Sequence, residues 1–226
     1  MLPHCFNTTR CPQFKKMTWY TKNTWTKEDE EEFFIRLKRA REYNRPQYLK
    51  TQAFALIETK EPELLDVAES LIIEMLKEYP NDTFNKSSAL DLLGDIYRQR
   101  GDHQTALKYY EESINFENDN PNSPQTPSFL SYSELIIKTQ QTDKYSIVEN
   151  LLFDRMDSVI LPVQKYKIAS ILSVIYQAKN NKKLAQHYAE IAEKNATAET
   201  SGFRYHKDLG IVKERVSWLD KLVNRK

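Results

Sequence analysis

The chain has 226 residues, of which 29% are charged and 40% hydrophobic, and its formal net charge is +1. This balance indicates neither a protein of overall basic charge that binds nucleic acid nor an acidic protein with basic substrates. The two glycine-rich patterns that hold phosphates, G-x-G-x-x-G and G-x-x-x-x-G-K-[ST], are excluded by the small number and spacing of the glycines. The four glycines are Gly94, Gly101, Gly202 and Gly210.

Residues 1–25 show no helical period. We expect them either to be disordered or to lie over the folded body through Trp19, Tyr20 and Trp25. Met17 begins a segment typical of a domain start, so the sixteen residues before it form a candidate upstream extension.

Residues that carry chemistry are scattered. Cys5 and Cys11 with His4 fall short of the four ligands of a structural zinc site, so the cysteines are interpreted as two reduced thiols. The four histidines form no H-E-x-x-H motif, and no G-x-S-x-G motif occurs. We therefore predict no metal, no cofactor and no enzymatic activity.

No apolar run approaches the length of about 18 residues that a transmembrane helix needs. The N-terminus also lacks the apolar segment of a signal peptide. We therefore predict a cytoplasmic protein without a membrane partner.

The first predicted helix covers residues 26–43. Thr26 is a suitable N-cap, acidic residues 28–32 lie in the first turns and basic residues in the last, which is the polarity that the helix dipole favours. The expected buried stripe consists of Phe33, Phe34, Leu37 and Ala40.

Basic side chains recur at spacings of three and four near the end of this helix, on or beside one face. This basic stripe is a candidate site for RNA phosphates or for an acidic partner. The alternative is a structural role, which the match to the helix dipole favours. The basic stripe comprises Arg36, Lys38, Arg39, Arg41 and Arg45.

The first predicted helix pair covers about residues 46–80. Pro46 suits the first turn of a helix, where a missing backbone N–H costs little. A second helix follows Glu61 and Pro62. Its main apolar positions and the proline that closes it are Ala68, Ile72, Met75 and Pro80.

The clearest pair covers residues 86–117. Leu90, Leu93 and Tyr97 form one stripe of its first helix. Gly101 can adopt positive φ where that helix ends, and Asp102 can cap the next helix. The second helix carries its stripe at Ala106, Tyr109, Tyr110 and Ile114.

These residues resemble the tetratricopeptide repeat, whose pattern is W-x-x-L-G-x-x-Y followed by Ala, an aromatic residue and Pro. Leu93, Gly94 and Tyr97 stand at the Leu-Gly and Tyr positions, while Leu90 replaces the opening Trp. Ala106 and Tyr110 stand at the small and aromatic positions of the second helix. In this resemblance residues 46–80 form a degenerate repeat, with Ala-Leu where Leu-Gly is expected.

An internal comparison supports the resemblance, since four residues of the 86–117 pair recur 79 positions later in the pair at about 165–195. Gly101 recurs as Asn180, the residue that follows glycine in preference for a left-handed helix end. The recurring residues are Leu172, Tyr176, Ala185 and Tyr188.

Two repeats of about 34 residues would span about 68, so the spacing indicates an insertion. Residues 118–128 contain three prolines and are predicted to form a protruding loop. A weaker helix pair follows at about 129–157, with Tyr132, Leu135 and Val148 among its apolar positions.

The last predicted element is a capping helix over about residues 201–224, of the kind that covers the open end of a solenoid. Its apolar positions alternate by four and three. They are Tyr205, Leu209, Val212, Val216, Leu219 and Val223.

The predicted fold is therefore all-α: residues 26–226 as a single domain, a tetratricopeptide-like right-handed solenoid of antiparallel helix pairs with an N-terminal helix and a C-terminal capping helix. The resemblance implies that the first helix of each pair lines a concave groove that holds a peptide or protein segment. The expected inward residues are Lys50, Ala53, Ile57, Lys60, Asp91, Asp95, Arg98, Ser133, Ile137, Gln140, Lys167, Ser170, Val174 and Gln177.

Some members of the family clamp the terminal carboxylate of a ligand with inward Lys and Asn residues. Asp91 and Asp95 occupy those slots here, so we expect a protein segment with some basic residues instead. The alternative is that these residues form an ordinary solvated helix face.

The preferred functional hypothesis is a non-enzymatic protein-binding module. One form of it is a dedicated inhibitor, or immunity-type protein, that masks a single cognate protein. The alternative is RNA binding through the basic stripe.

Overall fold

The computed structural model describes residues 18–223, and within them every regular element is helical: ten α-helices and two short 3-10 helices. The chain divides into two compact units between Pro80 and Asn81, rather than packing as the single helical domain expected for residues 26–226. Pro80 cannot extend the preceding helix, which ends at Glu78. Each unit is therefore described by itself.

In the first unit, α1 (Lys27–Arg39) is followed by the 3-10 helix η1 (Glu42–Asn44) and by the hairpin of α2 (Arg45–Ile57) and α3 (Pro62–Glu78). Helix α1 ends four residues before the predicted end at residue 43, because Ala40 is extended. The Arg45 guanidinium donates hydrogen bonds to the carbonyl oxygens of Lys38 (3.0 Å) and Ala40 (3.1 Å). These bonds satisfy carbonyl groups that a helix end leaves unpaired.

Residues 18–25 lie against this unit, which is one of the two alternatives for residues 1–25; residues 1–17 are outside the described range. The Trp19 ring packs 5.5 Å from that of Phe33 and 4.9 Å from that of Tyr48, measured between centroids. The fully buried amide of Gln52 bonds to both backbone groups of Lys22, at 3.0 Å and 2.7 Å. The segment is thus fastened to α2 by an apolar contact and a paired hydrogen bond.

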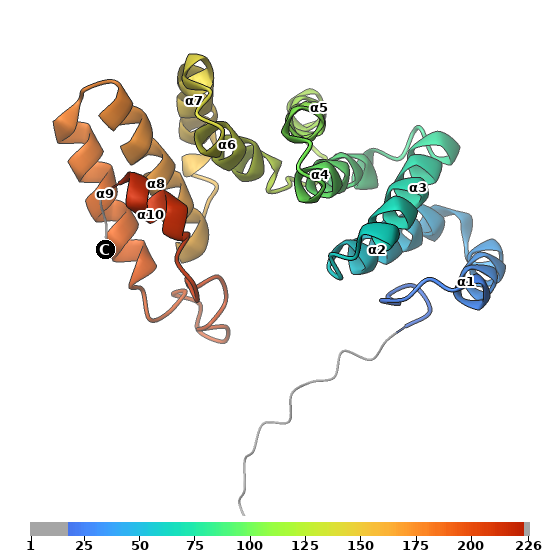
Figure 1. Cartoon of the computed structure of the whole chain (residues 1–226). Helices are drawn as coiled ribbons and strands as arrows, with labels where there is room; N and C mark the ends of the chain where they lie inside the picture. The colour runs from blue at the N-terminus through green and yellow to red at the C-terminus, as the bar shows by residue number, and fades with distance from the viewer. Residues whose placement is uncertain (1–17, 224–226) are drawn as a thin grey trace, which may run out of the picture. The chain divides into compact units, whose positions relative to one another are not determined.

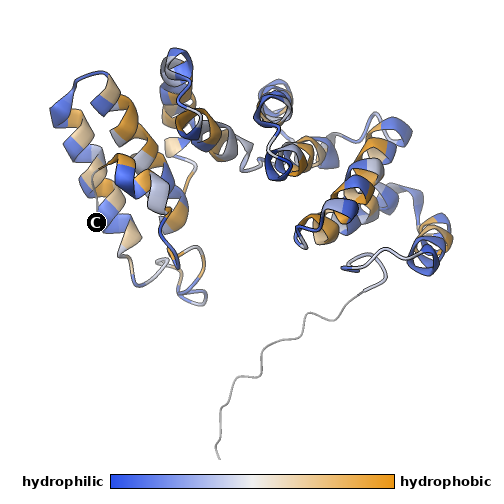
Figure 2. Cartoon of the chain, in the orientation of Figure 1, coloured by the Kyte–Doolittle hydropathy of each residue, from blue (hydrophilic) through white to orange (hydrophobic). Residues whose placement is uncertain are grey.

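The second unit contains three hairpins and a short final helix (Figure 1). Each hairpin packs within itself, α5 and α7 each contact the first helix of the following hairpin, and α6 contacts α8. Hydrophobic residues dominate α6 and α8, whereas α5 and α9 are more hydrophilic (Figure 2). The elements are α4 (Thr83–Gln99), α5 (His103–Asp119), α6 (Ser128–Lys138), η2 (Thr142–Lys144), α7 (Tyr145–Met156), α8 (Pro162–Ala178), α9 (Lys182–Ala196) and α10 (Ser217–Leu222).

All four hairpins share one turn. In each, a residue of positive φ follows the first helix, and its backbone N–H donates to the carbonyl oxygen three residues earlier. Such a left-handed residue is the usual end of an α-helix. The four residues are Lys60 (φ 63°), Gly101 (φ 80°), Gln140 (φ 54°) and Asn180 (φ 58°).

The recurrence at 79 residues is also a recurrence of geometry. The rings of Tyr97 and Tyr109 stack at 5.5 Å with an interplanar angle of 22°, and those of Tyr176 and Tyr188 stack at 5.5 Å with an angle of 5°. The hairpins α4–α5 and α8–α9 are therefore two copies of one packing unit.

The predicted protruding loop is instead tied back to the unit, which corrects that expectation. Thr126 is buried, and its N–H and hydroxyl group both donate to Glu117 Oε1, at 2.7 Å and 2.6 Å. The Ser87 hydroxyl group donates to the carbonyl oxygen of Pro124 at 3.0 Å. The prolines do break the helix, but these polar contacts hold the loop close to α4 and α5.

The predicted capping helix at 201–224 is wrong except for its last turns. Gly202 and Gly210 have positive φ, and Tyr205 and Leu209 are exposed rather than buried. The Val163 N–H donates to the Gly210 carbonyl oxygen at 2.7 Å, and a Cβ at Gly210 would lie 2.8 Å from Leu161 Cβ. The spacing of apolar residues suggested a helix, whereas this close glycine contact fixes a looped segment against the start of α8.

Among the described residues after α9, only α10 is helical, and it contacts α8. The buried Tyr166 hydroxyl group donates to Asp220 Oδ1 at 2.9 Å and accepts a hydrogen bond from the Val216 N–H at 3.0 Å. Arg215 forms a two-pronged ion pair with Glu193 of α9, at 2.8 Å and 2.5 Å. These contacts fasten the C-terminal segment to the last hairpin.

Candidate functional site

Half of the residues predicted to line the groove are buried, so they cannot contact a ligand. Ser133 shows the reason: its hydroxyl group donates to the Phe129 carbonyl oxygen of its own helix at 2.6 Å, on the packed side of α6. Ser170 does the same with Tyr166 at 2.7 Å. The buried residues are Ala53, Ile57, Asp91, Ser133, Ile137, Ser170 and Val174.

Asp91 is the most consequential of these corrections. It is 7% exposed and accepts a hydrogen bond from the Ser128 hydroxyl group at 2.6 Å. Burial raises the pKa of Asp91 to about 7, and the nearby charges of Asp95 and Glu117 act in the same direction. A residue expected to face a partner therefore belongs to a buried polar network at the start of α6.

Asp95 and Arg98, by contrast, remain accessible at one end of this network. The Tyr110 hydroxyl group and the Arg98 guanidinium both donate to Asp95 Oδ1, at 2.7 Å and 2.8 Å. Although burial opposes its charge, the pKa of Arg98 is raised, and the negative charges of Asp95 and Glu134 contribute. The charge of Glu134 on α6 therefore also acts on Arg98 of α4.

The next link joins α6 to α8. Lys167 Nζ lies 2.7 Å from Glu134 Oε1, with the two side chains 31% and 15% exposed. Glu134, one residue after the buried Ser133, is therefore the side chain through which α6 pairs with α8. Together these charges cross the first helices of three successive hairpins, and we call them the ionic row: Asp95, Arg98, Glu134 and Lys167.

The other predicted groove residues do not belong to the ionic row. Lys60 and Gln140 are exposed, but both occupy the left-handed turn positions of their hairpins. Gln177 is exposed in the last turn of α8, and Lys50 is half-buried on α2. A sequence-based assignment of inward faces could not distinguish these turn positions from the helix face.

The basic stripe is partly used within the protein. Arg45 ends α1 through the two carbonyl contacts described above, and Arg36 pairs with Glu32 at 2.8 Å. The Arg41 guanidinium donates to the Tyr43 hydroxyl oxygen at 2.9 Å. Lys38 and Arg39 are exposed. Three of the five cations therefore have partners within the chain.

Residues 18–223 contain neither a candidate metal site nor a candidate membrane span. No group of three His, Cys, Asp or Glu side chains is arranged to hold a metal ion there. None of the helices in that range is both long and apolar enough to cross a membrane. His4, Cys5 and Cys11 lie outside the described residues.

A scan against protein-family models finds no match, and searches of curated proteins and of solved structures find none either.

Proposed function

We propose that the chain is a protein-binding module whose stacked helical hairpins form a small tetratricopeptide-like solenoid. The observation that carries the proposal is the ionic row, which crosses α4, α6 and α8. These are the first helices of their hairpins, which line the binding surface in the family that the sequence resembles. The shared left-handed turn and the two tyrosine stacks support the repeat architecture.

The charges of the ionic row suit a partner that carries charges of both signs. The side chains are 15–41% exposed, so a partner can exchange these internal ion pairs for intermolecular ones without uncovering a deeply buried charge. Such pairs contribute specificity and association rate more than affinity.

An apolar anchor lies on the same face of α4. Phe84 is 64% exposed, and its spacing of eleven residues from Asp95 corresponds to about three helical turns. Aromatic residues, phenylalanine among them, are enriched at the centres of protein interfaces.

The proposal is tested by affinity capture from native lysate with the tagged full chain as bait. We expect a partner that is retained by the wild type and lost by the double variant Arg98→Ala/Lys167→Ala. The matched control is Lys108→Ala/Lys183→Ala, which removes two exposed cations from the second helices α5 and α9. Equal loss of the partner with the control, or no loss with either variant, would contradict the proposal.

A further inference from the structure

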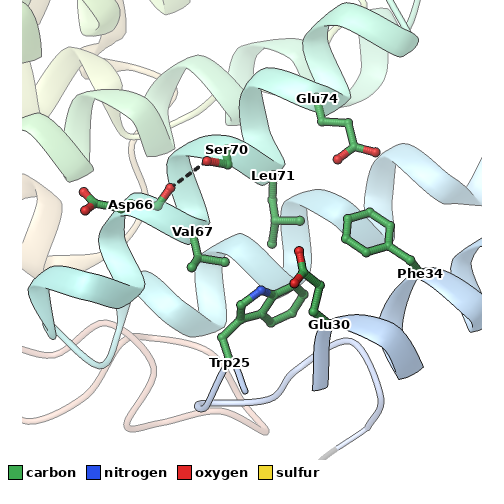
Figure 3. Close-up of a pocket in the computed structure, with 8 residues that line it drawn as sticks. All are labelled: Trp25, Glu30, Phe34, Asp66, Val67, Ser70, Leu71 and Glu74. Atoms are coloured by element: carbon green, nitrogen blue, oxygen red, sulfur yellow. Dashed lines mark hydrogen bonds between the residues drawn. The ribbon is translucent and has the colours of Figure 1, made fainter. Parts of the chain in front are cut away.

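A hollow of about 270 Å³ lies in the first unit, lined by α1, the residue before its N-cap, and α3. Two aromatic rings, those of Trp25 and Phe34, contribute to its walls, and Val67 and Leu71 add aliphatic surface from α3 (Figure 3). Sites for small organic molecules are usually about 300–1,000 Å³ in volume. This hollow therefore matches one side chain better than a cofactor.

Carboxylates line the same hollow. Figure 3 shows the Glu30 carboxylate beside the Trp25 indole and the Glu74 carboxylate on the side of Phe34. Within residues 18–223, neither of these two carboxylates takes part in an ion pair or a side-chain hydrogen bond. Partial burial raises the pKa of Glu74, and the charge of Glu78 adds to this shift. A cation in the hollow would relieve both effects.

The aromatic wall is held in place before any ligand arrives. Thr26 and Asp29 form a capping box directly after Trp25, with N···O distances of 3.2 Å and 3.0 Å. Lys22 Nζ lies 2.8 Å from Asp29, and the Trp25 ring packs edge-on against the buried Phe33 at 5.4 Å. The Trp25 indole is therefore a preorganised surface rather than a mobile side chain.

We propose that this hollow binds an arginine or lysine side chain of a partner protein, between the Trp25 and Phe34 rings and the carboxylates of Glu30 and Glu74. The inference rests on the proposed protein-binding function and assigns it a second contact point. Helix α3 has five acidic residues and one basic residue, so its field also favours a cation. Arginine should bind better than lysine, because its planar guanidinium stacks on aromatic rings and is less strongly hydrated.

The direct test uses the full chain labelled with 5-fluorotryptophan, which reports on Trp19, Trp25 and Trp218 separately. The probes are N-acetyl-arginine methylamide, the lysine equivalent, and the uncharged citrulline and norleucine equivalents. We expect a saturable ¹⁹F shift at Trp25 with the arginine probe, a weaker one with lysine, and none with the uncharged probes. No Trp25 shift, or an equal shift with norleucine, would overturn the proposal.

Paired variants identify the carboxylates. Glu30→Gln/Glu74→Gln should weaken binding of the arginine probe at least about tenfold, because both charges that face the cation are removed. The control Glu31→Gln/Glu63→Gln changes exposed residues of the same two helices by the same charge and should bind as the wild type does. If both pairs weakened binding of the arginine probe equally, the effect would come from the overall negative charge of the unit, and the proposed site would be overturned.

Capture from lysate then separates this inference from the proposed function. If the partner is lost with Glu30→Gln/Glu74→Gln and kept with the control pair, the occupant is a side chain of that partner. If the partner is kept with both pairs but lost with Arg98→Ala/Lys167→Ala, the hollow is overturned as a contact point while the protein-binding function stands.

Discussion

The hairpins α4–α5 and α8–α9 share a frame, by which we mean the turn, the helix cap and the tyrosine stack, but they differ in other side chains. Both have a stacked tyrosine pair, a left-handed turn residue, and a capping side chain that accepts from a backbone N–H three residues later: Asp102 from Thr105 and Asn181 from Leu184. The residues that shape a hairpin are thus maintained over 79 positions, because each satisfies a local requirement of the backbone or of the contact between the two helices.

The two hairpins differ, however, at one contact between their helices. Gly94 and Tyr110 of the first hairpin correspond to Ser173 and Ala189 of the last. A Cβ at Gly94 would lie 2.4 Å from the Tyr110 ring, so the ring fills the space beside the glycine. In the last hairpin the smaller Ala189 leaves a hollow of about 470 Å³ that Ser173 also lines. A frame can therefore be copied while the surface it presents changes.

The largest difference between the two hairpins lies at Asp91, whose counterpart is the neutral Ser170. Because the pKa of Asp91 is raised to about 7, the Asp91 carboxyl group binds a proton more tightly in the folded protein than in the unfolded chain. The contribution of Asp91 to the free energy of unfolding is therefore greatest below about pH 4 and falls as the pH rises toward 7. Relative to Asp91→Asn, we expect the wild type to lose about 3 kcal/mol between pH 5 and pH 8.

Urea unfolding followed by circular dichroism at the two pH values measures this effect. Asp154→Asn, at an exposed position on α7, is the control and should retain the pH dependence of the wild type. If Asp91→Asn also retains it, the buried carboxyl group does not titrate as inferred.

The close contact at Gly94 predicts the next largest effect. Gly94→Ala forces a methyl group against the buried Tyr110 ring and should lower the free energy of unfolding by about 1–3 kcal/mol. Ser173→Ala is the matched change in the last hairpin. It removes only the hydrogen bond to the Ala185 carbonyl oxygen and should cost about 1 kcal/mol. Equal costs at both positions would mean that the ring contact is not what distinguishes the hairpins.

The four shared turns allow a smaller and more general test. Gly101→Ala should cost about 1–2 kcal/mol, because a Cβ is strained at positive φ. Gln140→Gly and Asn180→Gly should instead leave stability unchanged or raise it by up to about 1 kcal/mol, with the larger gain at Gln140. Thermal unfolding of the three variants decides this, and a loss of stability in both glycine variants would show that the turns are not equivalent.

The difference between contacts within one hairpin and contacts with other elements explains what could be predicted from the sequence. Asn180 could be matched to Gly101, and Tyr188 to Tyr109, because helix ends and stacked rings depend on neighbouring residues. The predicted groove failed at Asp91 and Ser133 because burial there depends on the loop before α6 and on the packing of other hairpins. No periodicity within one helix reports such contacts.

The C-terminal segment illustrates the opposite error. Its apolar residues have helical spacing, but Gly202 and Gly210 interrupt it with positive φ. The two glycines were visible in the sequence, and Gly210 was the signal against a continuous helix.

The ionic row could not be predicted from the sequence, because Glu134 belongs to it only through its contact with Lys167 of another helix.

The smallest expected effect on stability is at the ionic row. Because these variants should remain folded, loss of a partner can be attributed to the removed charges. Arg98→Ala and Lys167→Ala each remove an ion pair between partly exposed side chains, so each should change the free energy of unfolding by less than about 1 kcal/mol. The double variant should therefore unfold close to the wild type while losing the captured partner. If it unfolds much more readily, these charges hold the hairpins together, and partner binding is tested instead with Phe84→Ala, which removes the exposed aromatic ring without removing an ion pair.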